Sequence, residues 1–87
     1  MDVTPEKVGM TPETCRAARA LLGISQAELA EHAGITMLTV RNYELAKSEP
    51  SHKTWRSMKA ALERRGVRFI DADEGGEGPG VRLRKAP

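Results

Sequence analysis

The sequence predicts a small, mainly α-helical domain that ends in a short two-stranded β-hairpin. Apolar residues recur at helical spacing in four segments between residues 12 and 65, and each segment follows a Ser or Thr that is able to cap a helix. After Gly66 the pattern changes to apolar residues that alternate with basic ones, which is typical of half-buried strands. The chain has 87 residues, of which 39% are hydrophobic and 3% aromatic, so its core must be aliphatic and small.

The N-terminal part of the chain predicts an arm followed by a first helix. Residues 1–10 lack any periodicity, and we expect them to form a flexible arm. Thr11 followed by Pro12 is typical of a helix start, because Pro at the first helical position loses no hydrogen bond. We predict a helix from Pro12 to about residue 22, ended by Gly23. Cys15 is the only cysteine, so it cannot form an intrachain disulfide; we expect it to be buried on the inner face of this helix with Ala18 and Leu22.

Two short helices joined by a tight turn are predicted next. Ser25, with a glutamate three residues later, forms a capping box at the start of a helix over about residues 26–33. Gly34 suits the left-handed conformation that ends this helix. Thr36 is able to cap the next helix, which we predict over about residues 37–45.

A fourth helix is predicted from its cap at Ser51 to about Arg65. Three apolar residues repeat along it at the spacing of one helix face, namely Trp55, Met58 and Leu62. This stripe is typical of a core rather than of a ligand site.

A β-hairpin tail is predicted over residues 67–87. Its strands are residues 67–70 and 81–84, separated by an acidic, glycine-rich loop over residues 71–80 that lacks the Lys-Ser/Thr ending of a nucleotide-binding loop. An isolated two-stranded ribbon is only marginally stable in water, so its apolar face needs a cover, either from the fourth helix or from a second subunit. We favour a contribution from the second subunit, with dimerisation through Val67, Phe69, Val81 and Leu83.

The two central helices resemble the helix-turn-helix of phage repressor and Cro-like (XRE) transcriptional regulators. The residues that carry the resemblance lie in both helices and in the loop after them: Gln26, Leu29, Ala30, Gly34, Val40, Glu44 and residues 47–51. The resemblance implies a four-helix, λ-repressor-like DNA-binding domain over residues 11–66, and small bacterial regulators of this type have a similar tail. It also implies a structural ion pair between Arg19 in the first helix and Glu44 at the end of the third.

The resemblance implies that the third helix enters the DNA major groove, which is wide enough to admit one helix. The expected base-contacting residues are Met37, Leu38, Arg41 and Asn42. Asn42 is able to pair with adenine, and Arg41 with guanine or a phosphate. Met37 and Leu38 have no hydrogen-bond donors, so we expect them to contact thymine methyl groups; the alternative is that they form an exposed protein-binding patch.

Phosphate contacts are expected around this helix. Gln26 lies at a helix N-terminus, where backbone N–H groups attract an anion, and by the resemblance its amide binds a backbone phosphate. The other phosphate-binding candidates are Thr36, Thr39, Lys47, Ser48 and Lys53. Ala46 stands where the family often has Gly, and a left-handed Ala costs roughly 1 kcal/mol. We therefore expect the third helix to end differently and to shift the loop that carries Lys47.

Charge and size favour a DNA-binding regulator. Residues 16–65 carry nine Lys and Arg against five Glu, whereas the whole chain has a net charge of +2, so the basic surplus lies on the predicted DNA-binding domain. One such module touches few base pairs, and we expect a homodimer on a palindromic operator with half-sites about 34 Å apart. The predicted function is that of a sequence-specific, double-stranded DNA-binding transcriptional regulator, acting as a repressor in the cytoplasm.

The alternative is an antitoxin-like or other protein-interaction module that binds a partner protein, with the acidic loop as the candidate segment. An enzyme is not expected, because the sequence has no catalytic Cys–His constellation and no metal-ligand spacing. We expect no cofactor, no metal and no small-molecule ligand. The longest apolar runs are too short to span a membrane, so no membrane association is expected.

Overall fold

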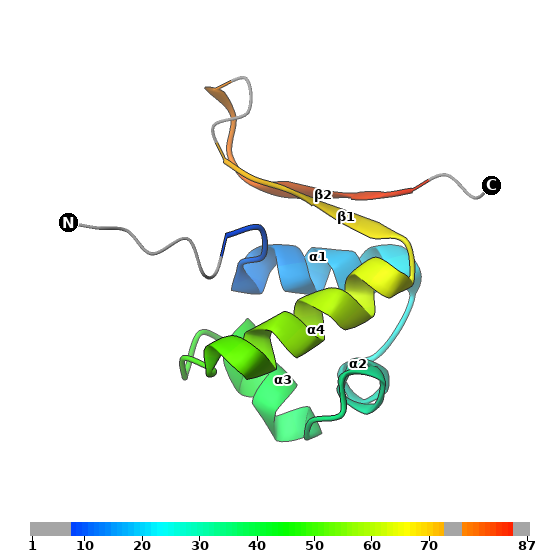
Figure 1. Cartoon of the computed structure of the whole chain (residues 1–87), viewed down its shortest axis with the longest axis vertical. Coiled ribbons are helices and arrows are strands. Elements are labelled where there is room, and N and C mark those ends of the chain that lie inside the picture. Colours follow the sequence, from blue (N-terminus) through cyan, green and yellow to red (C-terminus); the bar gives the residue numbers. More distant parts are fainter. Residues whose placement is uncertain (1–7, 73–75, 85–87) are drawn as a thin grey trace.

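The computed structural model describes residues 8–72 and 76–84, and its elements follow the predicted order (Figure 1). The helices are α1 (Pro12–Leu22), α2 (Gln26–Ala33), α3 (Met37–Glu44) and α4 (His52–Arg64), and the strands are β1 (Val67–Ile70) and β2 (Gly80–Leu83). The predicted fold class, mainly α-helical with a C-terminal hairpin, is confirmed. The second strand lies one residue earlier than predicted. Residues 1–7 of the predicted arm, 73–75 of the acidic loop and 85–87 of the tail lie outside the described residues.

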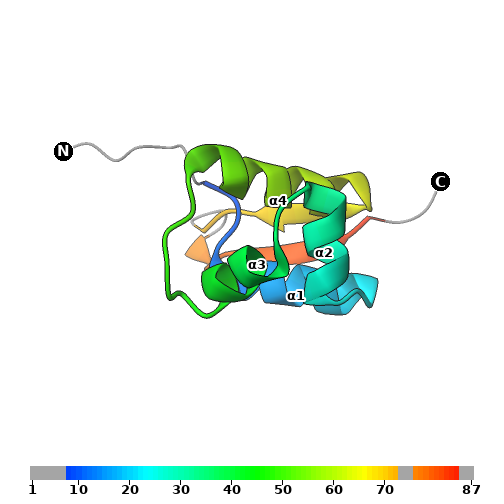
Figure 2. The same cartoon turned by 90° about the horizontal axis from the view of Figure 1, so that it is seen from below.

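The elements form three layers. The pair α2 and α3 lies at one end of the molecule, α1 and α4 lie in the middle, and the hairpin covers the far side (Figures 1 and 2). α1 contacts α3, α4 and both strands, whereas α4 contacts α2 and β1. The fully buried side chains therefore come from every helix and from β1, and they include Cys15, Leu29, Val40, Met58, Leu62 and Val67.

Met10 belongs to this core, so the predicted flexible arm is wrong at its last residue. Its side chain is only 2% exposed. Its carbonyl oxygen accepts hydrogen bonds from the Tyr43 hydroxyl and the Trp55 indole N–H, both at 3.2 Å, and the indole also donates to the Tyr43 oxygen. A single apolar residue outside any helix has no periodicity, so the sequence pattern did not reveal it. The two aromatic groups fix the chain just before α1 begins.

The end of α3 contradicts the expectation that Ala46 would displace it. Ala46 itself takes the left-handed conformation, with a φ of 58°, and among the described non-glycine residues no other has a positive φ. Its backbone N–H donates to Tyr43 at 2.9 Å, and the N–H of Lys47 donates to Asn42 at 2.8 Å. These two bonds form the Schellman motif that usually needs Gly. The helix therefore ends as it would with Gly at this position, at the expense of backbone strain in Ala46.

Helices of the same chain cover much of the hairpin, whereas the favoured contribution from a second subunit stays a prediction. Val67 pairs with Leu83 and Phe69 pairs with Val81, so these four side chains share one face. That face lies against α1 and α4, where Val67 is fully buried and Phe69 and Val81 pack on the core. Leu83 alone of the four predicted dimerisation residues is largely exposed, at 44%. The apolar face is covered because α1 packs against β2 and α4 packs against β1. The helix periodicity did not predict this arrangement.

Residues 8–72 and 76–84 contain neither a candidate membrane span nor a candidate metal site. Within this part of the chain, no helix combines the length and apolar character that crossing a bilayer requires. In the same residues, His, Cys, Asp and Glu side chains do not gather in groups of three or more that could hold a metal ion.

Candidate nucleic-acid interface

α2 and α3 form the end of the molecule that faces the viewer in Figure 2. Ala30 is 4% exposed, and its small side chain lets the two helices approach closely. Gly34 ends α2 in the left-handed conformation, with a φ of 72°, and the N–H of Ile35 donates to the Ala30 carbonyl at 3.0 Å. Thr36 then caps α3, because its hydroxyl oxygen accepts the N–H of Thr39 at 3.2 Å. The turn is therefore closed at both ends by hydrogen bonds, and the direction of α3 is fixed.

α3 presents one side to solvent. Met37 and Leu38 are 50% and 58% exposed, Arg41 is exposed, and Asn42 is half-buried. At about 100° per residue the four predicted base-contacting residues fall within an arc of about 140° around the helix, so they form one surface. Leu45 extends this surface by one turn and is 50% exposed. Leu45 was not among the predicted base-contacting residues, although its spacing of four from Arg41 and eight from Met37 places it on this side of the helix.

The buried side of α3 ends in Glu44, a carboxylate that is 1% exposed. Arg19 donates to both of its oxygens at 2.7 Å, through Nε and Nη2. Gln26 Nε2 donates at 3.0 Å, and the Cys15 thiol donates at 3.4 Å. The Arg16 guanidinium donates to the backbone carbonyl of the same glutamate. One residue at the end of α3 therefore holds α1 and the start of α2.

The protonation states of this cluster follow from burial and its hydrogen bonds. Burial opposes ionisation of Glu44, but the hydrogen bonds from Arg19 and Gln26 outweigh it and hold the pKa of the carboxyl below its ordinary value. Burial, together with the neighbouring carboxylate, raises the pKa of the Cys15 thiol. The thiol therefore stays protonated and serves as a weak donor rather than as a nucleophile.

Gln26, predicted to bind a phosphate, also has a structural partner in Glu44. Its amide nitrogen donates one hydrogen to Glu44, so a second N–H and the amide oxygen remain for another partner. Because Glu44 is fixed by Arg19, the amide of Gln26 is held at the N-terminus of α2 before any ligand arrives. Thr36 and Thr39 are also engaged, since their hydroxyl oxygens lie 2.9 Å apart. The first turn of each helix is thus pre-organised.

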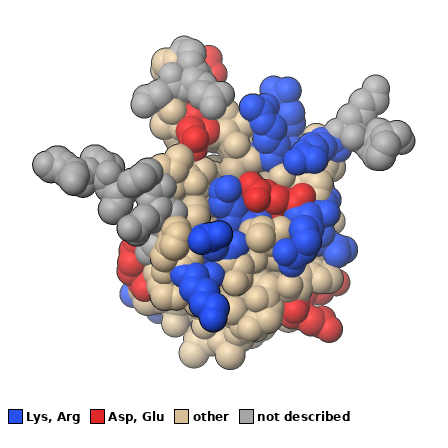
Figure 3. Space-filling view, viewed as in Figure 1, with Lys and Arg blue, Asp and Glu red and all other residues tan. Residues whose placement is uncertain are grey.

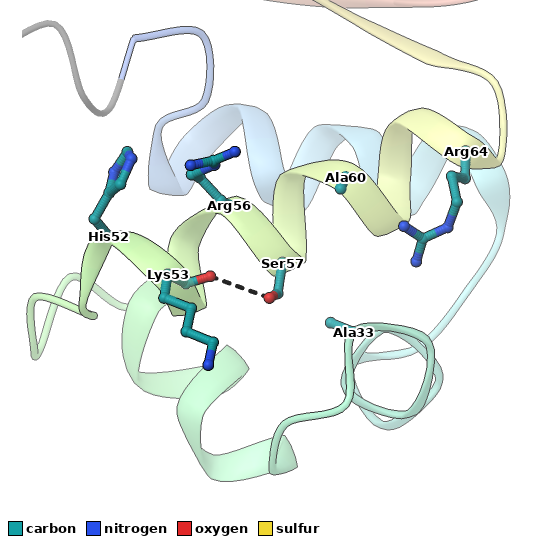
Figure 4. A pocket seen from close by; sticks show the side chains of 7 residues that line it. All are labelled: Ala33, His52, Lys53, Arg56, Ser57, Ala60 and Arg64. Carbon is teal, nitrogen blue, oxygen red and sulfur yellow. Dashed lines mark hydrogen bonds between the residues drawn. The ribbon is translucent and has the colours of Figure 1, made fainter.

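The remaining phosphate candidates lie on the loop after α3 and at the start of α4. Lys47 and Ser48 are exposed in the loop, and Lys53 is exposed in the first turn of α4. Lys53 also lines a groove between α4 and the end of α2 (Figure 4), whose other lining residues are Ala33, His52, Arg56, Ser57, Ala60 and Arg64. Three of the seven are cationic and none is acidic. On the face seen in Figure 3, Lys and Arg gather over α4 and beside the hairpin, whereas the end formed by α3 is mostly uncharged.

Comparison with known proteins decides the family. A family model described as helix-turn-helix, of the Cro/C1 (XRE) type, matches residues 16–66, which is more than half of the chain. The chain belongs to the Cro/C1-type helix-turn-helix family. The matched range begins within α1 and ends where the hairpin begins, so it contains α2, α3 and the whole of α4. A search of curated proteins finds no match to this chain.

Membership of the Cro/C1-type family gives the interface its general role. The family consists of DNA-binding regulators of transcription and is generally non-enzymatic. The chain is therefore a DNA-binding regulator, and α2 and α3 are the two helices of its helix-turn-helix.

Proposed function

We propose that this protein is a sequence-specific transcriptional repressor that binds double-stranded DNA as a homodimer on a palindromic operator in the cytoplasm. The observation that carries the proposal is the exposed side of α3, which is rigidly oriented by Glu44 and the two capped turns around it. Blocking a promoter requires only stable occupancy of a site, and no further domain has to act for that.

The exposed side of α3 combines two kinds of base contact. Asn42 offers a bidentate amide for adenine, and Arg41 offers a guanidinium for guanine or a phosphate. Met37 and Leu38 provide apolar surface for thymine methyl groups. We expect a half-site in which a position read by hydrogen bonds is followed by positions read through methyl contacts.

Phosphate contacts would supply much of the affinity. Gln26, Thr36 and Thr39 lie at helix N-termini, where backbone N–H groups and the helix dipole favour an anion. Lys47, Ser48 and Lys53 are exposed on the loop and the first turn of α4, from where they reach the backbone beside the groove. Two modules related by a two-fold axis would double both kinds of contact.

The salt dependence of binding tests the phosphate contacts. Binding of a duplex by the wild-type protein should weaken linearly on a plot of log K against log salt, with a slope of about −0.9 per phosphate neutralised. Lys47→Gln/Lys53→Gln removes two cations from each protomer and should reduce that slope by about 4 for the dimer. Arg65→Gln, which removes an exposed charge at the far end of α4, serves as the control. A slope that the double variant leaves unchanged would contradict the assignment.

A second candidate function has one observation in its favour. Met37, Leu38 and Leu45 are each at least half exposed and lie on one side of α3, which also suits a protein partner. An antitoxin-like module would use this patch against that partner. If Leu38→Lys abolished capture of a co-encoded protein and left duplex binding intact, this second function would be favoured over the first.

A further inference from the structure

The outer face of the hairpin carries three arginines without a described partner. Arg68 pairs with Arg82 across the ladder, so the two side chains share a face. Arg84 lies two residues after Arg82, and its backbone N–H continues the ladder by donating to the Gly66 carbonyl at 2.7 Å. Because side chains alternate along a strand, Arg84 lies on the same face as Arg82. All three are exposed. The ion pairs formed by the described residues, Arg19 with Glu44 and Lys59 with Glu63, involve none of them.

This arrangement is unfavourable for the hairpin alone. Like charges directly opposite each other on a sheet destabilise the pair of strands, and a guanidinium cannot lose its proton to relieve the repulsion. An anion between Arg68 and Arg82 would convert the repulsion into attraction. Guanidinium groups also bind phosphate oxygens through two parallel hydrogen bonds.

The chemistry of the face favours a nucleic acid over a protein. A protein interface needs an apolar centre with a polar rim, whereas here the apolar residues Val67, Phe69 and Val81 lie on the opposite, covered face. A polyanion needs no apolar centre, because neutralising its phosphates releases bound counterions. A two-stranded ribbon is also narrow enough to lie along a groove of duplex DNA.

The position of the face separates it from the helix-turn-helix. The hairpin and the pair α2–α3 lie at opposite ends of the longest axis of the molecule, with α1 and α4 between them (Figure 1). Because the inner face of the hairpin rests on α1 and α4, its outer face points away from α3. A duplex lying against α3 is therefore separated from the three arginines by α1 and α4.

We propose that Arg68, Arg82 and Arg84, here called the hairpin arginines, bind the phosphate backbone of a second DNA segment. One molecule then holds two segments together, one on α3 and one on the hairpin. The inference rests on the proposed function for the first segment only. The second contact is made to phosphates, so it is independent of sequence.

A sandwich assay tests the proposal. Beads carry a biotinylated first duplex with the sequence that the protein prefers in a selection experiment. The amount of protein that the beads retain is measured first. A labelled second duplex of unrelated sequence is then added, and the amount of it that the protein retains is measured. All α3 surfaces are saturated with the first duplex, so a dimer has no free helix-turn-helix for the second. Wild-type protein should retain both. The variant Arg68→Gln/Arg82→Gln/Arg84→Gln should itself be retained on the beads as well as the wild type. The amount of second duplex that it retains should be at least tenfold lower.

The matched control removes three charges from another surface. Arg56→Gln/Arg64→Gln/Arg65→Gln changes the exposed cations of α4 and its C-cap and should keep the wild-type amount of second duplex for each protein molecule that the first duplex retains. Loss of the second duplex in this control alone would place the second site on α4 and overturn the proposal. Retention of the second duplex by the hairpin variant, or its absence with wild-type protein, would overturn it as well.

Folding and the first function are checked separately. Since the hairpin variant removes a like-charge pair, its melting temperature should equal or exceed that of the wild type. If no duplex retained wild-type protein through α3, the proposed function would fail. The hairpin proposal would then be decided by direct titration of an unrelated duplex, where the hairpin variant must bind at least tenfold more weakly than wild-type protein and the α4 control must not.

Discussion

The buried carboxylate of Glu44 fixes the orientation of α3. Glu44 accepts hydrogen bonds from Arg19, Gln26 and Cys15, which come from two other helices. Removing either charge of such a buried pair leaves the other charge without compensation, which costs more than the pair itself contributes. The pair therefore fixes geometry, and its loss should weaken DNA binding indirectly.

The pH dependence of stability tests this cluster. The folded-state pKa of Glu44 lies below its ordinary value of 4.5, so its stabilising contribution is complete above about pH 4.5 and is lost as the pH falls through the folded value. In urea titrations between pH 5 and about pH 3, Glu44→Gln should show a flatter decline of the unfolding free energy than the wild type. The exposed Glu31→Gln variant should keep the wild-type slope. Equal slopes for Glu44→Gln and wild type would contradict the assignment.

Ala46 supplies a second prediction at this scale. Its φ of 58° is strained for Ala and free for Gly, so Ala46→Gly should raise the unfolding free energy by up to about 1 kcal/mol. Gly34→Ala is the converse control: a Cβ there would meet nothing within 4 Å, so the expected loss of about 1 kcal/mol reports backbone strain alone. Chemical denaturation measures both. A lower unfolding free energy for Ala46→Gly than for the wild type would contradict the claim that the left-handed conformation of Ala46 is strained.

Some of these residues could be predicted from the sequence and others could not. Arg19 and Glu44 were paired through the family resemblance, and the structure shows them 2.7 Å apart. Cys15 and Gln26 were assigned other roles, because their contacts with Glu44 span 29 and 18 residues and no local pattern encodes them. Met10 escaped for the same reason, since its partners Tyr43 and Trp55 are distant in the chain.

At the scale of elements, the proposed reading of DNA depends on α3, and the sequence predicted α3 together with the other three helices. The caps and the helical periodicity predicted all four helices to within one residue, because each begins with a Ser or Thr that accepts a backbone N–H. The strands followed from the alternation of Val67, Phe69, Val81 and Leu83. What covers them could not be predicted, since packing of β1 and β2 on α1 and α4 depends on how the helices cross.

The thymine methyl contacts give the prediction that belongs to α3. Replacing contacted thymines with deoxyuridine in a bound site removes only the methyl groups, and wild-type affinity should fall. Leu38→Ala should bind the thymine duplex and the deoxyuridine duplex with the same lower affinity. The difference in affinity between the two duplexes should therefore be smaller for this variant than for the wild type. Asn42→Ala should instead lose about 1–3 kcal/mol of discrimination at one position and keep the methyl effect. Anisotropy titrations of the four combinations measure the coupling, and a coupling of zero would contradict the methyl contact of Leu38.

At the scale of the whole molecule, the hairpin contributes to stability and is also the predicted site of the proposed dimer. Val67 and Leu83 face each other across the ladder, but Val67 is fully buried and Leu83 is 44% exposed. Val67→Ala should therefore cost about 2 kcal/mol of unfolding free energy. Leu83→Ala should leave the unfolding free energy of the monomer within about 0.5 kcal/mol.

The same pair separates stability from dimerisation. If the exposed edge of the hairpin contributes to the dimer, sedimentation equilibrium should show weaker self-association for Leu83→Ala. A dimer that this variant leaves unchanged would remove the hairpin from the interface. The dimer contacts would then have to lie on the helices.

Selection of bound sequences from random duplex DNA tests the central claim that the exposed side of α3 reads base edges. Wild-type protein should enrich a palindromic motif, and Arg41→Ala/Asn42→Ala should lose the enrichment at the corresponding positions while keeping its fold and its salt-sensitive binding. No enriched motif with wild-type protein, or the same motif with the double variant, would contradict the account.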